Sequence, residues 1–268
     1  MVTKATIAYD NIIDRDETVF SASNTVATLP ASNLADAVVG RVMRCVGTTT
    51  TIQITADAAT PFQQCGFFGI AEAITDFAMT LKASNVSMGA SEILNFDGAS
   101  PGTGKSYQKS LGRYSRRQAL ADFGAAFTAK YIEIAITTTG ANVEFGRLVL
   151  APVVAEMARN ITWPIEGKSV DQSLIKRMTG ADLIFERPVL AEWTVQWGDG
   201  ISDQDLLETA LLTLDRVIGL RKQVVYTQEP GGTYTGINTT TLGRFQELGP
   251  NSQIGYGRRG KTIRILES

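Results

Sequence analysis

The sequence predicts a mainly β protein, in which a β-sandwich at residues 1–155 is followed by an α+β domain at residues 156–268. Two observations support this fold class. Before Pro152, short segments alternate between apolar and polar residues and are separated by turn-forming residues, as in antiparallel sandwiches. After Pro152, one capped amphipathic segment lies between strand-like segments, which is typical of an α+β arrangement with one main helix.

The expected strands of the N-terminal half are short, and each one either alternates with period two or is apolar throughout. They are residues 5–9, 41–45, 51–54, 64–70 and 77–82. The most informative segment is residues 130–152, in which β-branched and aromatic residues lie on both sides of Thr139–Asn142. This pattern predicts a β-hairpin that is closed by a turn.

Residues 95–124 are the least regular part of this half, and we expect a surface excursion that contacts a neighbouring subunit. Its basic side chains are the first candidates for such an interface. An aromatic residue outside the expected strands and a basic pair near the C-terminus are further candidates. The candidate interface residues are Arg113, Arg116, Arg117, Trp163, Arg258 and Arg259.

The segment 202–218 is the expected main helix of the C-terminal domain. Ser202 is a candidate N-cap residue with an acidic residue three positions later, and leucines then recur at helical spacing up to Ile218. Gly219 is well placed to end the helix. The strands expected around this helix are residues 193–197, 224–226 and 262–266.

The composition removes several classes of function. A net charge of −2 leaves no electrostatic footprint for nucleic acid or an anionic membrane. The chain has no histidine, which removes His-containing triads and the commonest metal ligand. Cys45 and Cys65 are expected to be reduced and buried. Because we recognise neither a signal peptide nor a run of 18 apolar residues, we expect a soluble protein made in a cytoplasm.

Residues 99–106 match a relaxed phosphate-loop pattern, but no helix with a clear apolar stripe follows, so a turn-rich loop is favoured. Paired carboxylates can do acid–base chemistry without histidine, and Asp14, Asp16 and Glu17 cluster in the sequence. A solvated turn is favoured for these three residues, and a Ca²⁺ site stays open as an alternative. We therefore expect no enzymatic activity and no cofactor.

The motifs of the chain resemble two known families. The segment Phe145-Gly146-Arg147-Leu148 resembles the closing strand of a jelly-roll sandwich of the galactose-binding type. Together with Ala31-Ser32-Asn33-Leu34 and Thr51-Ile52-Gln53-Ile54, it is similar to the sandwich domains of tailed-phage structural proteins. Arg187-Pro188 and Trp193-Thr194-Val195, followed by the leucine-rich helix, resemble distal tail proteins of siphophages and gene-transfer-agent-like particles.

The resemblance implies a structural component of a virion. Such a protein forms a homo-oligomeric ring, with a hexamer as the expected state, at the distal end of a phage tail, where it links the tail tube to the hub and the tip or baseplate. The alternative is a carbohydrate-binding module in which the sandwich loops hold a host surface glycan. A nucleotide hydrolase, based on residues 99–106 alone, is the third class.

Overall fold

The computed structural model describes residues 5–112, 117–156, 166–171, 174–178, 181–185, 189–197, 213–228, 240–249, 252–255 and 258–267. The chain forms two compact units. The first combines Met1–Glu156 with Tyr226–Thr240, and the second combines Met157–Val225 with Thr241–Ser268. The chain first passes from the first unit to the second after Glu156, one residue beyond the expected boundary after residue 155. The return of residues 226–240 to the first unit was not expected.

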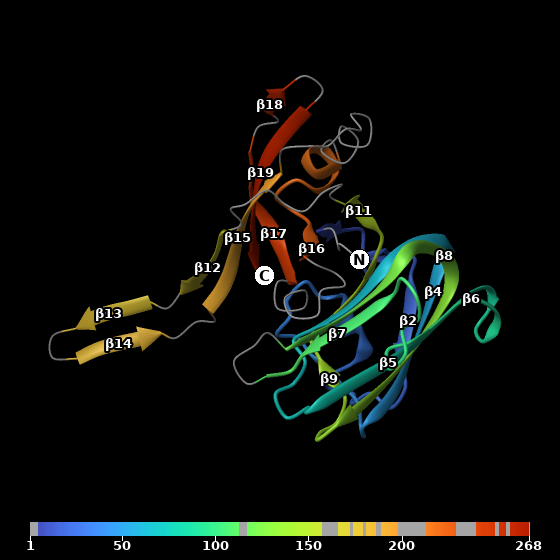
Figure 1. Ribbon diagram of the computed structural model, residues 1–268. Coiled ribbons are helices and arrows are strands. Elements are labelled where there is room, and N and C mark those ends of the chain that lie inside the picture. Colours follow the sequence, from blue (N-terminus) through green and yellow to red (C-terminus); the bar gives the residue numbers. More distant parts are fainter. Residues whose placement is uncertain are drawn as a thin grey trace. The chain divides into compact units, whose positions relative to one another are not determined.

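The first unit contains most of the strands that the structure describes (Figure 1). They are β1 (Thr6–Ala8), β2 (Val19–Ala22), β3 (Met43–Arg44), β4 (Thr49–Phe68), β5 (Asp76–Ser87), β6 (Ala90–Asp97), β7 (Ser106–Ser110), β8 (Gln118–Thr139), β9 (Glu144–Phe145), β10 (Arg147–Ala151) and β11 (Val153–Glu156). Two 3-10 helices, η1 (Ile12–Asp14) and η2 (Ala31–Ala35), lie between the early strands.

Two long bent strands, β4 and β8, build the sandwich because each takes part in both of its layers. The register between them is interrupted between Thr55 and Thr60. On one side of this break β4 pairs with β2, and β8 pairs with β5, which in turn pairs with β6. On the other side β4 pairs with β10 and β8 pairs with β7. The expected β-sandwich is confirmed, and the expected strands at 51–54 and 64–70 belong to one strand.

Aromatic side chains fill the space between the two layers. The ring centroids of Phe67 on β4 and Phe77 on β5 lie 5.0 Å apart. Those of Phe96 on β6 and Phe123 on β8 also lie 5.0 Å apart. Because each pair joins residues from opposite layers, these contacts mark the centre of the core, and the rings are fully or almost fully buried.

The hairpin expected at residues 130–152 is wrong in its pairing, although both of its strands and the turn are present. β8 and β10 pair with opposite edges of β4, so Leu120 and Val149 both lie opposite Gly66. Between them the chain turns at Gly140, whose φ is 93°, and β9 then pairs with β3. The apolar pattern locates strands, but it does not contain the identity of their partners.

The surface excursion expected at residues 95–124 is also wrong over much of its length. β7 is paired with β8, and Ala119, Ala121 and Phe123 lie in the hydrophobic core. The apolar alternation at the start of β8 was not recognised, because its buried positions are mostly alanines, which give a weak signal for a strand. Residues 113–116 lie outside the described part of the chain.

The second unit contains an antiparallel sheet with the strand order β17–β19–β15–β12. These strands are β12 (Glu166–Asp171), β15 (Val189–Trp197), β17 (Thr241–Leu248) and β19 (Arg258–Glu267), and β18 (Ser252–Gly255) pairs with β19. Val195, Phe245, Ile263 and Ile265 are buried. A separate two-stranded sheet is formed by β13 (Leu174–Met178) and β14 (Ala181–Phe185). The strand β16 (Gln223–Thr227) crosses from this unit to the first.

The described part of the expected helix is the short π-helix η3 (Thr213–Ile218), and residues 202–212 lie outside the described residues. Leu214 and Ile218 are buried, as their spacing predicts. Gly219 ends the helix with a positive φ of 54°, and its N–H donates to the Leu214 carbonyl at 2.8 Å. Among the described residues, no helix has the length and apolarity needed to cross a membrane.

Candidate functional site

Of the six candidate interface residues, only Arg117 has a described side chain. Arg113, Arg116 and Trp163 lie outside the described residues, and Arg258 and Arg259 are placed by their backbone at the start of β19.

Arg117 binds to the chain's own backbone. Its guanidinium donates to the carbonyl oxygens of Ile70 (3.0 Å) and Ala71 (2.8 Å), and also to those of Leu111 and Ile74. The half-buried side chain thus holds the segment between β4 and β5 against the end of β7. Its observed role is to fix loops within the first unit.

The acidic residues of the N-terminal turn do not converge. Asp14 binds Arg147, whereas Glu17 shares a hydrogen bond with Asp57, and this contact is the main cause of the raised pKa of Glu17. In the part of the chain that the structure describes, no group of three or more His, Cys, Asp or Glu residues is placed to hold a metal ion.

Residues 99–106 form turns between two strands. Ser106 begins β7, whereas a phosphate loop has to open a helix. The ammonium group of Lys105 lies 5.6 Å from the ring centroid of Phe127. The favoured interpretation of this motif as a turn-rich loop therefore agrees with the structure.

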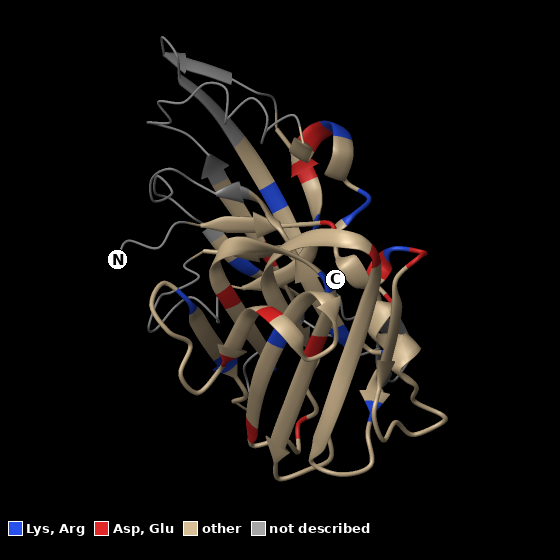
Figure 2. Cartoon of the chain, turned by 90° about the vertical axis from the view of Figure 1, so that its right-hand side faces the viewer, with Lys and Arg blue, Asp and Glu red and all other residues tan. Residues whose placement is uncertain are grey.

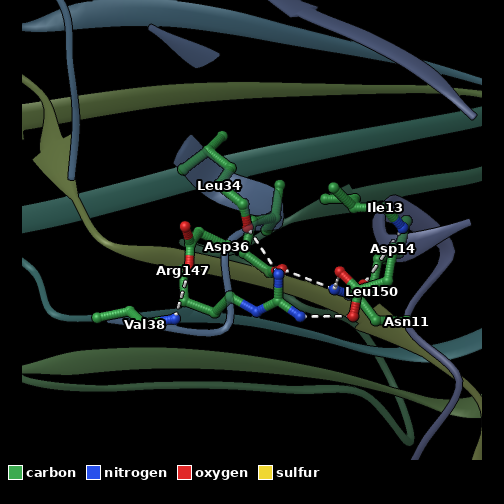
Figure 3. Close-up of polar contacts among 9 residues, drawn as sticks. Asn11, Ile13, Asp14, Leu34, Asp36, Val38, Arg147 and Leu150 are labelled. Atoms are coloured by element: carbon green, nitrogen blue, oxygen red, sulfur yellow. Dashed lines mark hydrogen bonds and ion pairs between the residues drawn. The ribbon is translucent and has the colours of Figure 1, made fainter. Parts of the chain in front are cut away.

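A polar cluster inside the first unit joins the N-terminal turn to β10 (Figure 3). Arg147 is only 2% exposed, and its Nη2 lies 2.5 Å from the Asp14 carboxylate. Its Nη1 donates to the Leu34 carbonyl at 3.1 Å. The charge of Arg147 also contributes to the lowered pKa of Asp36, whose main cause is the N–H donated by Val38. A buried charge requires such partners, so this cluster has a structural role.

Asn11 completes the cluster by occupying the free edge of β10. Its Nδ2 donates to the Leu148 carbonyl at 3.0 Å, and its Oδ1 accepts the Leu150 N–H at 2.8 Å. One amide side chain therefore takes the place of a neighbouring strand. This arrangement protects the edge from pairing with another chain.

The first candidate surface is a rigid group of turns beside the start of β4 and the end of β8. β3 pairs with β9, with Arg44 opposite Glu144, and an isolated bridge joins Thr25 to Cys45. The Val46 N–H donates to the Asn24 carbonyl at 2.7 Å. The Cys45 N–H donates to Val143 at 2.9 Å, and the Val143 N–H donates to Gly47 at 3.0 Å. Three distant segments of the chain are thus held together by backbone hydrogen bonds.

Four side chains on these turns, Arg44, Val46, Asn142 and Glu144, are named here the turn patch. Arg44 and Glu144 form an ion pair, and their hydrogen bond raises the pKa of Arg44. The Oδ1 of Asn142 accepts the Gly47 N–H at 3.2 Å. Val46 is 66% exposed. The patch therefore combines a carboxylate, a guanidinium, an amide and an apolar side chain on a rigid backbone.

The second candidate surface is the two-stranded sheet β13–β14 of the second unit, named here the arm. Its strands follow β12 and precede β15, and Figure 1 shows it as a ribbon continuing from them. The registered pairs of one face are Leu174–Phe185, Lys176–Leu183 and Met178–Ala181. Those of the other face are Ile175–Ile184 and Arg177–Asp182.

Charged residues outside these surfaces are interspersed over the strands (Figure 2). Several form ion pairs within the first unit, including Arg15–Asp10 at 2.5 Å and Lys82–Glu92 at 2.7 Å. Sequence reasoning did not identify Asn11 or the role of Arg147. The signal for Arg147 was a charged residue inside an apolar run, because such a residue has to find partners when the strand is buried.

No protein-family model and no curated protein matches the sequence. Solved structures do match, at low identity. The chitosan-binding module 1 of a chitosanase/glucanase from Paenibacillus sp. IK-5 is 15% identical, with a TM-score of 0.39, and the match covers 53% of this chain and 98% of that one. CpGH89CBM32-5 from Clostridium perfringens, solved with GalNAc-β-1,3-galactose, is 10% identical, with a TM-score of 0.39 and coverage of 53% and 99%.

A third match is the GH29 fucosidase E1_10125 of Ruminococcus gnavus, at 13% identity and a TM-score of 0.40, covering 54% of this chain and 27% of that one. With TM-scores of 0.39–0.40, these matches do not indicate what this chain binds. From its own strands, the chain is a mainly β protein with an N-terminal β-sandwich.

Proposed function

We propose that this chain is a non-catalytic assembly subunit that joins neighbouring proteins through its surfaces. The observation that carries this proposal is the arm. In the described part of the chain, β13 and β14 pair only with each other. An isolated two-stranded ribbon is at best marginally stable in water, so it needs a partner that covers one of its faces.

The composition of the arm supports the same conclusion. Its ten strand residues include Leu174, Ile175, Met178, Leu183, Ile184 and Phe185. Four of them, Leu174, Met178, Leu183 and Phe185, belong to the registered pairs of one face. Full burial of each such side chain is worth about 1.5–3 kcal/mol, so these four together represent on the order of 10 kcal/mol. Docking of this face on another protein would supply this free energy.

The sequence resemblance supplies the biological context of the proposal. It points to a ring-forming adaptor in a virion, with six copies at the distal end of a phage tail, in contact with the tail tube and hub. None of the solved structures named above is a tail protein, so this context rests on the sequence motifs alone.

A photo-crosslinking experiment tests the proposal. p-Benzoylphenylalanine is introduced at Leu183 on the arm, and at the exposed Gln53 on β4 as a control. We expect Leu183 to give intermolecular adducts with a second copy or with coexpressed tail proteins, while Gln53 gives none. If neither position yields an intermolecular adduct, the arm has no docking role and the proposal fails.

The second candidate function is carbohydrate binding, and the turn patch is the observation that favours it. Its backbone is fixed before any ligand arrives, so binding would lose little conformational entropy. Retention of the purified full chain on a glycan array, abolished by the free sugar, is the expected result. An array on which the chain is retained by no glycan removes this candidate and leaves the assembly proposal intact.

A further inference from the structure

We infer that copies of this chain meet head to tail, with a basic corner of the second unit of one copy docked on an acidic edge of the first unit of the next. The basic corner consists of Arg216, Val217, Leu220 and Arg221, and the acidic edge consists of Asp16, Glu17, Val19 and Asp57. This inference rests on the proposed assembly function and adds to it a second contact, which does not involve the arm.

The basic corner presents exposed apolar side chains between two cations. Val217 and Leu220 are 50% and 52% exposed, and a backbone hydrogen bond from the Gly219 N–H fixes the turn between them. Arg216 and Arg221 are exposed on either side, and neither forms an ion pair with another described residue. A fixed apolar centre flanked by cations favours a partner surface that is both apolar and acidic.

The acidic edge has this complementary chemistry. Val19 on β2 is 71% exposed and pairs with Thr55 on β4. Continuing the same register by two residues places Glu17 opposite Asp57, in agreement with the hydrogen bond that these two side chains share. Asp16, Glu17 and Asp57 are all exposed, and among the described residues none of them forms an ion pair with a basic side chain.

The contact between two carboxyl groups indicates that this edge carries more negative charge than its own basic side chains balance. The hydrogen bond and the charge of Asp57 both raise the pKa of Glu17. The charge of Arg15 acts on Asp57, but its guanidinium is held by Asp10 at 2.5 Å. A guanidinium from another copy would offset the repulsion, because its planar group of donors matches carboxylate oxygens.

A second copy of this chain is the partner that supplies the required chemistry. Each copy carries one basic corner and one acidic edge, on different units, so the contact is heterologous and repeats from copy to copy, as in a ring. Docking would also cover Val19 with Val217 and Leu220, which removes apolar surface from water. Exposed ion pairs are individually weak, so this contact orients the copies that the arm brings together.

Charge reversal on each surface gives two variants that should rescue each other. Arg216→Glu combined with Arg221→Glu makes both surfaces of a copy acidic. Glu17→Lys combined with Asp57→Lys makes both surfaces basic. In either variant alone the two surfaces repel each other, whereas in a mixture every acidic surface meets a basic one.

Sedimentation velocity of the full chain at low ionic strength measures self-association, and circular dichroism checks that each variant is folded. We expect each surface variant to weaken self-association about tenfold or more, and an equimolar mixture of the two to restore it to within about threefold of the wild type. The control combines Arg41→Glu with Lys82→Glu, which reverses two exposed charges that form ion pairs outside both surfaces. It should stay within about twofold of the wild type.

The outcomes separate this contact from the assembly proposal. Surface variants that associate like the wild type, or a mixture that stays as weak as its components, overturn the contact, while intermolecular adducts at Leu183 still support the assembly role of the arm. A wild type that stays monomeric at every concentration overturns the contact. If Leu183 then also gives no adduct, the assembly proposal fails as well.

Discussion

The ion pair between Arg147 and Asp14 allows a prediction in which the two single variants differ although they break the same contact. Arg147 is 2% exposed, whereas the side chain of Asp14 is 42% exposed. Asp14→Asn leaves a buried guanidinium with the Leu34 carbonyl and the nearby Asp36 charge as its described partners. Arg147→Met removes the buried charge, keeps an apolar stem, and returns a half-exposed carboxylate to water.

The magnitudes follow from these environments. A hydrogen bond to a charged group is worth about 1.5–3 kcal/mol, and an unpaired buried charge adds a desolvation penalty. Because Asp14 is partly exposed to solvent, both the free energy of its hydrogen bond to Arg147 and the desolvation penalty of breaking that bond are reduced. We expect Asp14→Asn to destabilise the first unit by about 2–3 kcal/mol and Arg147→Met by about 1 kcal/mol. The double variant should resemble Arg147→Met, because no buried charge is left unpaired.

Chemical denaturation of the four proteins, followed by far-UV circular dichroism, measures these differences. The coupling free energy from the double-mutant cycle should be about 2–3 kcal/mol, because the double variant is expected to lose no more than Arg147→Met alone. Additive effects, or a larger loss for Arg147→Met than for Asp14→Asn, would refute the reasoning that the buried guanidinium dominates the pair.

Three further predictions concern the first unit. Gly146→Ala should lower the free energy of unfolding by about 3 kcal/mol, because the added Cβ would overlap the Val39 carbonyl. Gly40→Ala has open space around the added Cβ and should change this free energy by less than about 0.5 kcal/mol, so thermal unfolding of the two variants tests the prediction. Burial raises the pKa of the Cys65 thiol, so iodoacetamide at pH 8 should leave Cys65 unmodified until the chain unfolds, and alkylation of the folded chain would contradict its burial. The pKa of Asp36 is lowered in the folded state, mainly because its carboxylate accepts the Val38 N–H. Its contribution to stability should therefore be present above about pH 4 and be lost as the pH falls through the lowered pKa. An NMR titration of the folded chain should show the lowered pKa, and an ordinary aspartate pKa would contradict the prediction.

Local residue patterns were sufficient to predict most individual strands. The alternation at 77–82 and the strand pattern at 262–266 correspond to β5 and β19. Gly219 ends the helix where predicted, since its positive φ is a local property. These features depend on neighbours in sequence, and periodicity records them well.

Pairing and site geometry depend on distant residues, and the sequence pattern alone does not contain them. The register break of β4 between Thr55 and Thr60 creates two layers from one strand, and no composition signal distinguishes it from a turn. Asn11 meets Leu150 across 139 positions. The turn patch likewise joins Arg44 to Glu144 across 100 positions. Such contacts follow from topology, which a single sequence without homologues does not specify.

Sedimentation velocity of the full chain over a concentration series tests the assembly role most directly. The comparison is with a variant in which residues 174–185 are replaced by a short Gly-Asn-Gly turn. We predict concentration-dependent oligomers for the full chain, with a hexamer as the expected end state, and a monomer for the variant, since the docking ribbon is gone. A full chain and a variant that both sediment as monomers at every concentration, or that both form the same oligomer, would contradict it.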